Sequence, residues 1–321
     1  MKKLITAILL ASITAGAFAL PNLLKKEEFG ANAIDELSFD LTSEKICVQE
    51  TNDDTSIEVE IYCNYKKYAP EVSVSGSTLY IESVRNHMSI FRDPTGLSCT
   101  VIVYVPQKKD FEEISIKTAS GEISIERPLY AKSEINIEAA SGEISSEKGL
   151  FADNIKVRAS SGEIDLYNID ADDLKVSTSS GDIKIQKFTG SSGSVHASSG
   201  EIKATDFASE YAEFKTTSGK ITVKKLDCDY FDATSASGGI SLELKNAPTA
   251  SSNAICSSGN IDIYIPMRAK FSVEASSNSG TFRDKFNNTR LNPRDTYQMD
   301  YNGGGSVIKL RTASGNITLE Y

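Results

Sequence analysis

Three stretches of this chain are nearly identical: VRASSGEI at residues 157–164, VSTSSGDI at 176–183 and VHASSGEI at 195–202. Each contains a Ser-Gly pair followed by an acidic residue and an isoleucine. The pair recurs in a series of ten, 19 to 21 residues apart except for a last interval of 35. A repeat of this length is typical of a protein built from stacked structural units. The glycines of the series are Gly121, Gly142, Gly162, Gly181, Gly200, Gly219, Gly238, Gly259, Gly280 and Gly315.

The residues on either side of each glycine alternate between apolar and polar. The fifth residue before the glycine is apolar in every unit, the sixth before it is polar, and the second after it is isoleucine or phenylalanine. Such alternation is typical of a β-strand with one buried face. The inward positions are odd-numbered before the glycine and even-numbered after it, so the chain must bend there. We expect the first eight glycines, Gly121 to Gly259, to be structural corners, because glycine takes positive φ without strain.

These patterns predict an all-β fold, a single-chain parallel β-solenoid with about 20 residues per coil. A unit of this size cannot bury its own apolar face, so each strand has to pair with its equivalent in the next coil, about 4.8 Å away. We expect a right-handed coil from the usual handedness of parallel connections. A β-propeller or a β-sandwich is the alternative, but both need antiparallel hairpins and longer repeat units.

The chain also has less regular parts. Residues 20–110 are strand-rich, and we expect them to start the solenoid and cap its first edge, which would otherwise be open to aggregation. Within them Ser75-Gly76 resembles a degenerate unit. Residues 111–321 hold the ten units, and 283–305 are expected to form an excursion loop before the last strand.

Residues 1–19 have the pattern of a secretory signal peptide. Lys2 and Lys3 precede an apolar run, and Ala17-Phe18-Ala19 supplies a small-x-small cleavage pattern. An uncleaved N-terminal anchor is the alternative. We therefore expect an exported protein of the periplasm, the cell surface or the extracellular space, with no membrane span in the mature chain.

The composition excludes several function classes. The 321 residues carry 44 acidic and 34 basic side chains, a net charge of −10, whereas a nucleic-acid binder needs a dominant basic face. Only two histidines are present, which argues against the usual histidine-based metal centres. No cofactor motif is found, so no cofactor is expected. The five cysteines read as structural, and the connectivity of Cys47, Cys63 and Cys99 stays open.

One column of residues could carry chemistry as an acidic ladder. The residue after the glycine is acidic in the first five units, and outward carboxylates one coil apart could chelate a divalent cation or line a glycan groove. A solvated face is the stronger interpretation, since calcium needs six to eight convergent oxygens. The acids are Glu122, Glu143, Glu163, Asp182 and Glu201.

A second column is basic and lies on the outward face of the strands that precede the glycines. It forms a possible surface-binding stripe for an acidic polymer, made of Lys156, Arg158, Lys175 and Lys215, with Lys117 and His196 beside them. Glu138, Glu213 and Asp232 interrupt the stripe, so an ordinary charged surface is the stronger interpretation. The repeated serines have no histidine base and orienting acid of their own, so no catalytic residue is assigned.

The units at 157–164 and 176–183 resemble the bacterial putative-adhesin β-strand-repeat family. Val103-Tyr104-Val105-Pro106 before the first unit and the closing segment from Gly303 to Leu319 extend the likeness over about residues 33–321. The resemblance implies an exported β-solenoid domain of unknown function and brings no catalytic residues.

The sequence therefore predicts a non-enzymatic, exported β-solenoid of the cell envelope that acts as an adhesin-like binding or structural surface. Its expected partner is a glycan, a cell-envelope polymer or a protein, and not a nucleic acid. Two alternatives remain: a carbohydrate-active enzyme that uses the acidic ladder, and an envelope-stress accessory protein.

Overall fold

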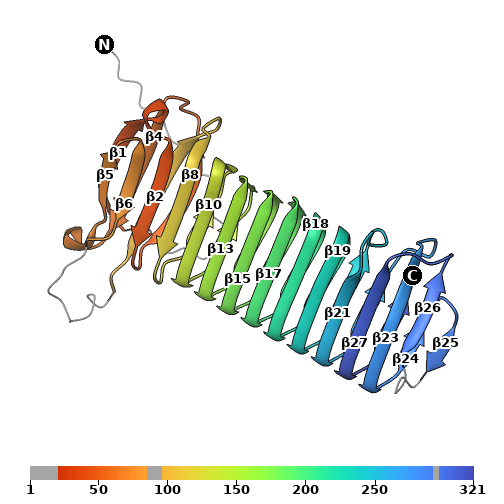
Figure 1. The fold of residues 1–321 in the computed structure, drawn as a ribbon. Helices are drawn as coiled ribbons and strands as arrows, with labels where there is room; N and C mark the ends of the chain where they lie inside the picture. The colour runs from red at the N-terminus through yellow and green to blue at the C-terminus, as the bar shows by residue number, and fades with distance from the viewer. Residues whose placement is uncertain (1–20, 85–95, 292–295) are drawn as a thin grey trace, which may run out of the picture.

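The computed structural model describes residues 21–84, 96–291 and 296–321, so the signal peptide predicted at 1–19 lies outside the described residues. The described chain is almost entirely β-structure, and its helices are two single turns, η1 (Ala31–Ala33) and η2 (Lys66–Tyr68). The all-β prediction is confirmed. Figure 1 shows the strands lying side by side along one long axis, from the N-terminal region to the C-terminal region.

The strands that lead into the Ser-Gly pairs form one stack, named here the first stack. Its central strands pair in parallel, and each end is closed by an antiparallel strand. In spatial order it contains β5 (Glu71–Ser75), β6 (Thr78–Glu82), β2 (Glu36–Leu41), β8 (Phe111–Thr118), β10 (Leu129–Ser141), β13 (Asn154–Ser161), β15 (Asp173–Ser180), β17 (Ser192–Ser199), the second parts of β18 (Ile202–Ser218) and β19 (Ile221–Ser237), β21 (Ser252–Ser258), β27 (Val307–Ser314), β23 (Phe271–Ser279) and β26 (Tyr297–Tyr301).

The strands that follow the Ser-Gly pairs form the second stack, which is also parallel in the middle and antiparallel at its ends. In spatial order it contains β1 (Leu23–Gly30), β4 (Ser56–Cys63), β7 (Cys99–Pro106), β3 (Lys45–Thr51), β9 (Ile123–Ile125), β11 (Ile144–Ser146), β14 (Ile164–Asp170), β16 (Ile183–Thr189), the first parts of β18 and β19, β20 (Ile240–Leu244), β22 (Ile261–Tyr264), β28 (Ile317–Glu320), β24 (Phe282–Asp284) and β25 (Thr289–Leu291). The short strand β12 (Leu150–Phe151) lies on the return to the first stack and pairs with β10 and β14.

The core is a set of aliphatic columns between the two stacks. Ile164 pairs with Ile183, and Ile183 pairs with Ile202, 19 residues further along each time. All three side chains have 0% exposure. Burial of one such side chain stabilises the fold by roughly 1.5–3 kcal/mol, so the repeated isoleucine position is a main source of stability. The positions predicted to face inward on both sides of the glycine are the buried ones.

The N-terminal end differs from the prediction. Ser75 ends β5, and Gly76 begins the turn of the antiparallel hairpin β5/β6, so the degenerate unit predicted there is wrong. The first coil is instead β2 and β3, whose bend at Thr42-Ser43-Glu44 contains no glycine. The carboxylate of Glu44 accepts hydrogen bonds from the backbone N–H groups of Thr42 and Ser43, both at 2.8 Å. Because this coil lacks the Ser-Gly pair, the repeat did not reveal it.

The C-terminal end is capped by part of the segment predicted as an excursion loop, residues 283–305. Here β25 pairs antiparallel with β24, and β26 pairs antiparallel with β23. The last unit of the chain does not lie at the end of the stack: β27 lies between β21 and β23, and β28 lies between β22 and β24. The tenth unit is therefore inserted between the eighth and the ninth.

A disulfide joins Cys63 of β4 to Cys99 of β7, which face each other across an antiparallel pair. Cys47, Cys228 and Cys256 are free thiols. Burial, followed by the charge of Glu126, raises the pKa of Cys47 to about 12, and this thiol is therefore protonated and unreactive at neutral pH.

Candidate functional site

The Ser-Gly bends lie directly above one another and approach very closely. A Cβ atom on Gly162 would lie 1.9 Å from the carbonyl oxygen of Gly142 in the preceding coil, and one on Gly181 would lie 2.0 Å from that of Gly162. This close approach, and not positive φ, is the requirement shared by the column, because Gly181 has φ of 151° whereas Gly162 has no positive φ. A backbone carbonyl oxygen blocks the Cβ position at all eight predicted corners, Gly121, Gly142, Gly162, Gly181, Gly200, Gly219, Gly238 and Gly259.

Several of the glycine carbonyls accept a hydrogen bond from the residue three before the glycine of the next coil. Thr312 Oγ1 donates to Gly259 at 3.0 Å, and Ser235 Oγ donates to Gly219 at 3.2 Å. Both side chains are buried, so each bond satisfies a polar group inside the bend. The alternating pattern predicts only that this position faces inward and carries no signal for the bond.

The acidic ladder lies on the second stack, immediately after the bends. Lys45 pairs with Glu122 at 2.8 Å, and Lys203 pairs with Glu201 at 2.8 Å. Partial burial, followed by the charges of Glu122 and Glu163, raises the pKa of Glu143. The ladder is thus a row of like charges, partly offset by lysines at its two ends.

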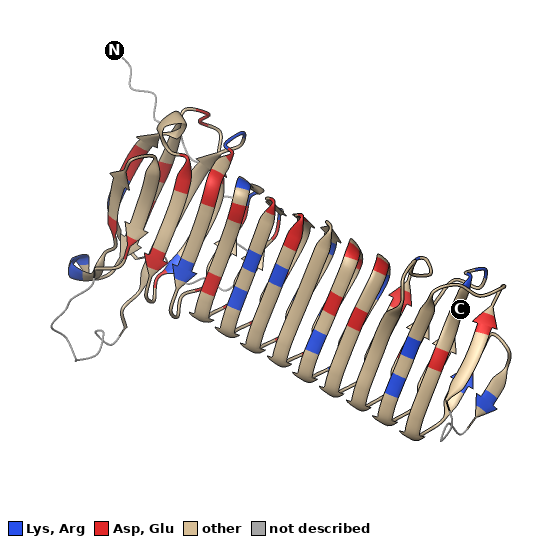
Figure 2. Cartoon of the chain, viewed as in Figure 1, with Lys and Arg blue, Asp and Glu red and all other residues tan. Residues whose placement is uncertain are grey.

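A groove of about 720 Å³ crosses seven neighbouring strands of the first stack, from β2, which contributes Asp40 and Leu41, to β18, on their outward face. Its floor is formed by the small residues two before each glycine, Ala119, Ala140, Ser160, Ser179, Ser198 and Thr217. The neighbouring column consists of Asp40 and of the residues four before each glycine, which are longer except for Ser177: Lys117, Glu138, Arg158, Ser177, His196 and Lys215. Figure 2 shows basic and acidic positions interspersed along this face.

Only two of the four residues of the predicted basic stripe line this groove. Arg158 and Lys215 line it, and among the described residues neither makes an ion pair. Lys156 lies outside the lining and pairs with Glu134 at 2.8 Å, and Lys175 pairs with Asp173. The structure therefore leaves Arg158 and Lys215 available to a ligand and neutralises the other two.

His196 also lines the groove, but its surroundings are not those of a catalytic base. Its Nε2 atom lies 3.0 Å from Glu213 Oε2, and Ser194 Oγ donates to the same oxygen at 3.2 Å. Glu213 thus lies between the serine and the histidine, whereas a serine nucleophile needs a direct bond to its histidine.

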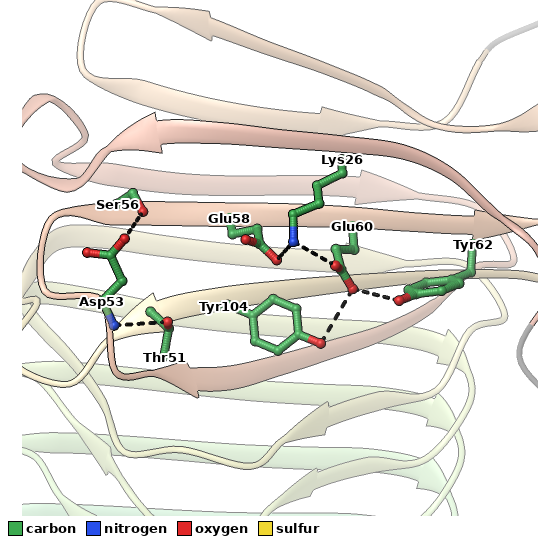
Figure 3. Close-up of polar contacts among 8 residues, drawn as sticks. All are labelled: Lys26, Thr51, Asp53, Ser56, Glu58, Glu60, Tyr62 and Tyr104. Carbon is green, nitrogen blue, oxygen red and sulfur yellow. Dashed lines mark hydrogen bonds and ion pairs between the residues drawn. The ribbon is translucent and has the colours of Figure 1, made fainter. Parts of the chain in front are cut away.

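The charged groups of a polar cluster at the N-terminal end pair with one another (Figure 3). Lys26 Nζ of β1 lies 2.6 Å from Glu58 and 3.1 Å from Glu60 of β4, and Tyr62 donates to Glu60 at 2.6 Å. Burial acts to raise the pKa of Glu60, but the hydrogen bonds from Tyr62 and Lys26 outweigh it and lower that pKa. Burial and the charge of Glu60 raise the pKa of Tyr104 to about 12. The cluster therefore joins β1 to β4.

A smaller cavity of about 490 Å³ lies on the return side of the coils. Tyr130 and Phe151 stack there with ring centroids 4.7 Å apart, and Asp110, Asp153 and Asp170 lie around them. These residues belong to no column of the Ser-Gly repeat, so the sequence pattern did not predict the cavity.

Two further features of the described residues concern metal binding and membrane spans. No three His, Cys, Asp or Glu side chains come together there in a way that would hold a metal ion. None of the helices in this part of the chain has the length and apolar character of a membrane span.

Several solved structures resemble this chain over most of its length. A putative lipid binding protein from Parabacteroides distasonis ATCC 8503 is 16% identical, with a TM-score of 0.44, over 91% of this chain and 96% of that one. A putative adhesin from the same strain is 13% identical, with a TM-score of 0.41, over 93% and 97%. A putative adhesin from Bacteroides fragilis NCTC 9343 is 16% identical, with a TM-score of 0.35, over 93% and 96%. At these identities and scores the likeness says nothing of function.

No curated protein matches the chain. The sequence profile of the Toastrack DUF4097 family matches residues 34–149 and 147–320, which together span nearly all of the described region. This agrees with the resemblance found in the Ser-Gly units, and the chain belongs to the Toastrack DUF4097 family.

Proposed function

We propose that this protein is a non-enzymatic, exported component of the cell envelope, a right-handed β-solenoid of about 20 residues per coil whose groove is a binding surface. One observation carries the proposal: the groove crosses seven coils and combines a floor of small side chains with exposed cations that make no ion pair among the described residues. An elongated ligand could contact equivalent positions on each coil.

The absence of a catalytic role is supported by the geometry of the polar groups. His196 contacts Glu213 and does not contact a serine that could act as its nucleophile. The acids of the ladder repeat with the coil, so none is distinguished from the others as acid or base. The groove is lined by none of them.

The alternative, a carbohydrate-active enzyme, is favoured by one observation. Glu143 has a raised pKa and stands between two other acids, as the general acid of a glycosidase does. Such an enzyme would lose its hydrolytic activity with Glu143→Gln. Hydrolysis of envelope polysaccharides by the wild type, lost in that variant, would replace the binding proposal by this one.

The binding proposal is tested with the mature chain and purified cell-envelope material from the producing bacterium. Ser179→Met fills the floor of the groove without adding charge and should abolish retention on this material. Ser257→Met is the matched control, because Ser257 occupies the same position before Gly259 and lies outside the groove lining. Equal retention of the two variants and the wild type, or none for the wild type, contradicts the proposal.

A further inference from the structure

We propose that the groove binds a linear acidic polysaccharide that carries a carboxylate on every second sugar. This rests on the proposed function of the groove as a binding surface and names the class of ligand. The occupant follows from the charge pattern of the groove, the coil spacing and the chemistry of the floor.

The charges of the groove alternate over its first four coils. The strand register places Asp40 beside Lys117, Lys117 beside Glu138 and Glu138 beside Arg158. Lys117 and Arg158 are therefore two coils apart, or about 10 Å at the usual strand spacing.

The other half of the groove is less regular. Ser177 lies beside Arg158, His196 lies beside Ser177, and Lys215 lies beside His196. Lys215 is thus three coils from Arg158 and lies outside the alternation.

The acidic position between Lys117 and Arg158 disfavours an anion. Glu138 lies between Lys117 and Arg158 and accepts a hydrogen bond from Asn136 at 3.0 Å. Because this donor is a neutral amide, the negative charge of Glu138 still faces a ligand in the groove. Ser177, between Arg158 and His196, is neutral. A ligand with an acid at every coil would place one of them against Glu138, whereas a ligand with an acid at every second coil would not.

The cations that would hold the acid groups are free to do so. Lys117, Arg158 and Lys215 are exposed, and among the described residues none of the three makes an ion pair. An arginine in this state can bind a carboxylate through two parallel hydrogen bonds, which are stronger than bonds between neutral groups.

The floor suits sugars more than other polymers. Its methyl groups, at Ala119 and Ala140, and its hydroxyl groups, at Ser160, Ser179, Ser198 and Thr217, match the mixed apolar and hydroxyl faces of a pyranose. The coil spacing of about 4.8 Å is close to the length of one sugar in an extended β-linked chain, so each coil would meet one sugar.

Two other polymers fit less well. Single-stranded nucleic acid needs aromatic stacking platforms, and the groove lining contains no aromatic side chain other than the imidazole of His196. An acidic peptide would gain affinity by adding a strand to a sheet edge, but the groove runs across the strands, whose backbone groups are already paired with neighbouring coils.

The test measures the affinity of the mature chain for three oligosaccharides of equal length by calorimetry. Hyaluronan carries a carboxylate on alternate sugars, β-1,4-linked glucuronan carries one on every sugar, and cellulose fragments carry none. We expect hyaluronan to bind tightest. The combined variant Lys117→Gln, Arg158→Gln, Lys215→Gln should weaken its binding by at least about tenfold, because the two in-register charge-assisted contacts of Lys117 and Arg158 and the nearby charge of Lys215 are lost.

The matched control is the combined variant Lys220→Gln, Lys224→Gln, Lys270→Gln. It removes the same charge from exposed lysines outside the groove, which also make no ion pair among the described residues. This control should bind hyaluronan within about twofold of the wild type, since long-range electrostatics alone are weak at physiological salt. Equal losses in the two triple variants would overturn the assignment of the groove.

The alternation is tested separately by Glu138→Gln. This variant should narrow the preference for hyaluronan over glucuronan by about threefold or more, because one repulsive charge is removed. An unchanged preference, or polyglutamate binding as tightly as hyaluronan, would show that the groove is not specific for alternating acidic sugars. If envelope retention is still lost with Ser179→Met while hyaluronan does not bind, this inference fails and the proposed function stands.

Discussion

Two of the bends in each regular coil, the Ser-Gly bend and the next one along the chain, meet different physical demands. At the Ser-Gly bend, adjacent coils approach so closely that a Cβ atom on Gly162 would lie 1.9 Å from a backbone oxygen. At the second bend, six residues later, the chain passes through the left-handed region, with φ of 54° at Asn168, 67° at Lys187 and 53° at Lys225. The first bend is governed by the neighbouring coil and the second by local backbone conformation.

This difference explains why one bend is conspicuous in the sequence and the other is not. A blocked Cβ position admits one residue type, so glycine recurs at every unit. The left-handed conformation is unfavourable for most residues but open to all except the β-branched ones at moderate cost, so the second bend is occupied by Asn, Lys and Asp. A strict steric requirement leaves a motif, whereas a moderate conformational preference leaves none.

The largest expected effect is at the first bend. Gly162→Ala places its Cβ atom against the carbonyl oxygen of Gly142, and the adjacent bends cannot move apart without breaking the parallel pairing on either side. We expect a loss of about 3 kcal/mol in the free energy of unfolding, the upper range for overpacked sites. Chemical denaturation measures it.

The control for that substitution is Gly30→Ala, because a Cβ atom there would have no heavy atom within 4 Å. Gly30 has φ of −60°, which alanine also adopts, so the variant should be as stable as the wild type or slightly more stable. If Gly162→Ala and Gly30→Ala unfold alike, close approach is not the reason for glycine at the bend.

A medium effect is expected where a hydroxyl group supports the first bend. Thr312→Val removes the hydrogen bond to the carbonyl of Gly259 and should cost about 1 kcal/mol. Thr222→Val is the matched control, because Thr222 Oγ1 is buried without a hydrogen-bond partner, and its loss should be neutral or stabilising. Thermal unfolding of the pair gives the comparison, and equal shifts would refute the role of the bond.

A smaller effect of opposite sign is expected at the second bend. Lys187→Gly should raise the free energy of unfolding by about 0.5 kcal/mol, because relief of the left-handed strain exceeds the extra chain entropy of glycine. Lys187→Val should lower it, since a β-branched residue avoids this region. A loss of stability with glycine would mean that the lysine side chain itself supports the bend.

The smallest effect is expected just beyond the first bend, in the acidic ladder. Glu163 is exposed, and like charges about 4.8 Å apart in water repel by only about 1 kcal/mol. Glu163→Gln should therefore change the unfolding midpoint little, with or without calcium. A large destabilisation of the variant that appears only when calcium is present would identify the ladder as a metal site and overturn this reading.

Much of the fold could be predicted because each coil repeats the same burial pattern. The apolar residue two positions after each Ser-Gly bend marks the inward face of the second stack. Three of these residues, Ile164, Ile183 and Ile202, are paired and buried as the periodicity predicted. The coil of β2 and β3 could not be found in the same way, because Glu44 there replaces the Ser-Gly pair by side-chain hydrogen bonds.

The candidate site was only partly predictable. The sequence placed Lys156, Arg158, Lys175 and Lys215 on one outward face, but it does not show which of them are neutralised. That depends on acids brought near by folding, such as Glu134 of the preceding coil beside Lys156. The groove itself arises because small side chains and mostly longer ones stand in adjacent columns of the stacked coils.

By itself, the sequence determined that the chain is a stack of β-coils and which side chains are buried, because alternation and a recurrent glycine are local consequences of strand geometry and close backbone approach. Only the tertiary structure decided the insertion of β27 between β21 and β23, the antiparallel caps, the Cys63–Cys99 disulfide and the free cations of the groove. These features depend on contacts between residues far apart in the chain, and no periodic pattern records such contacts.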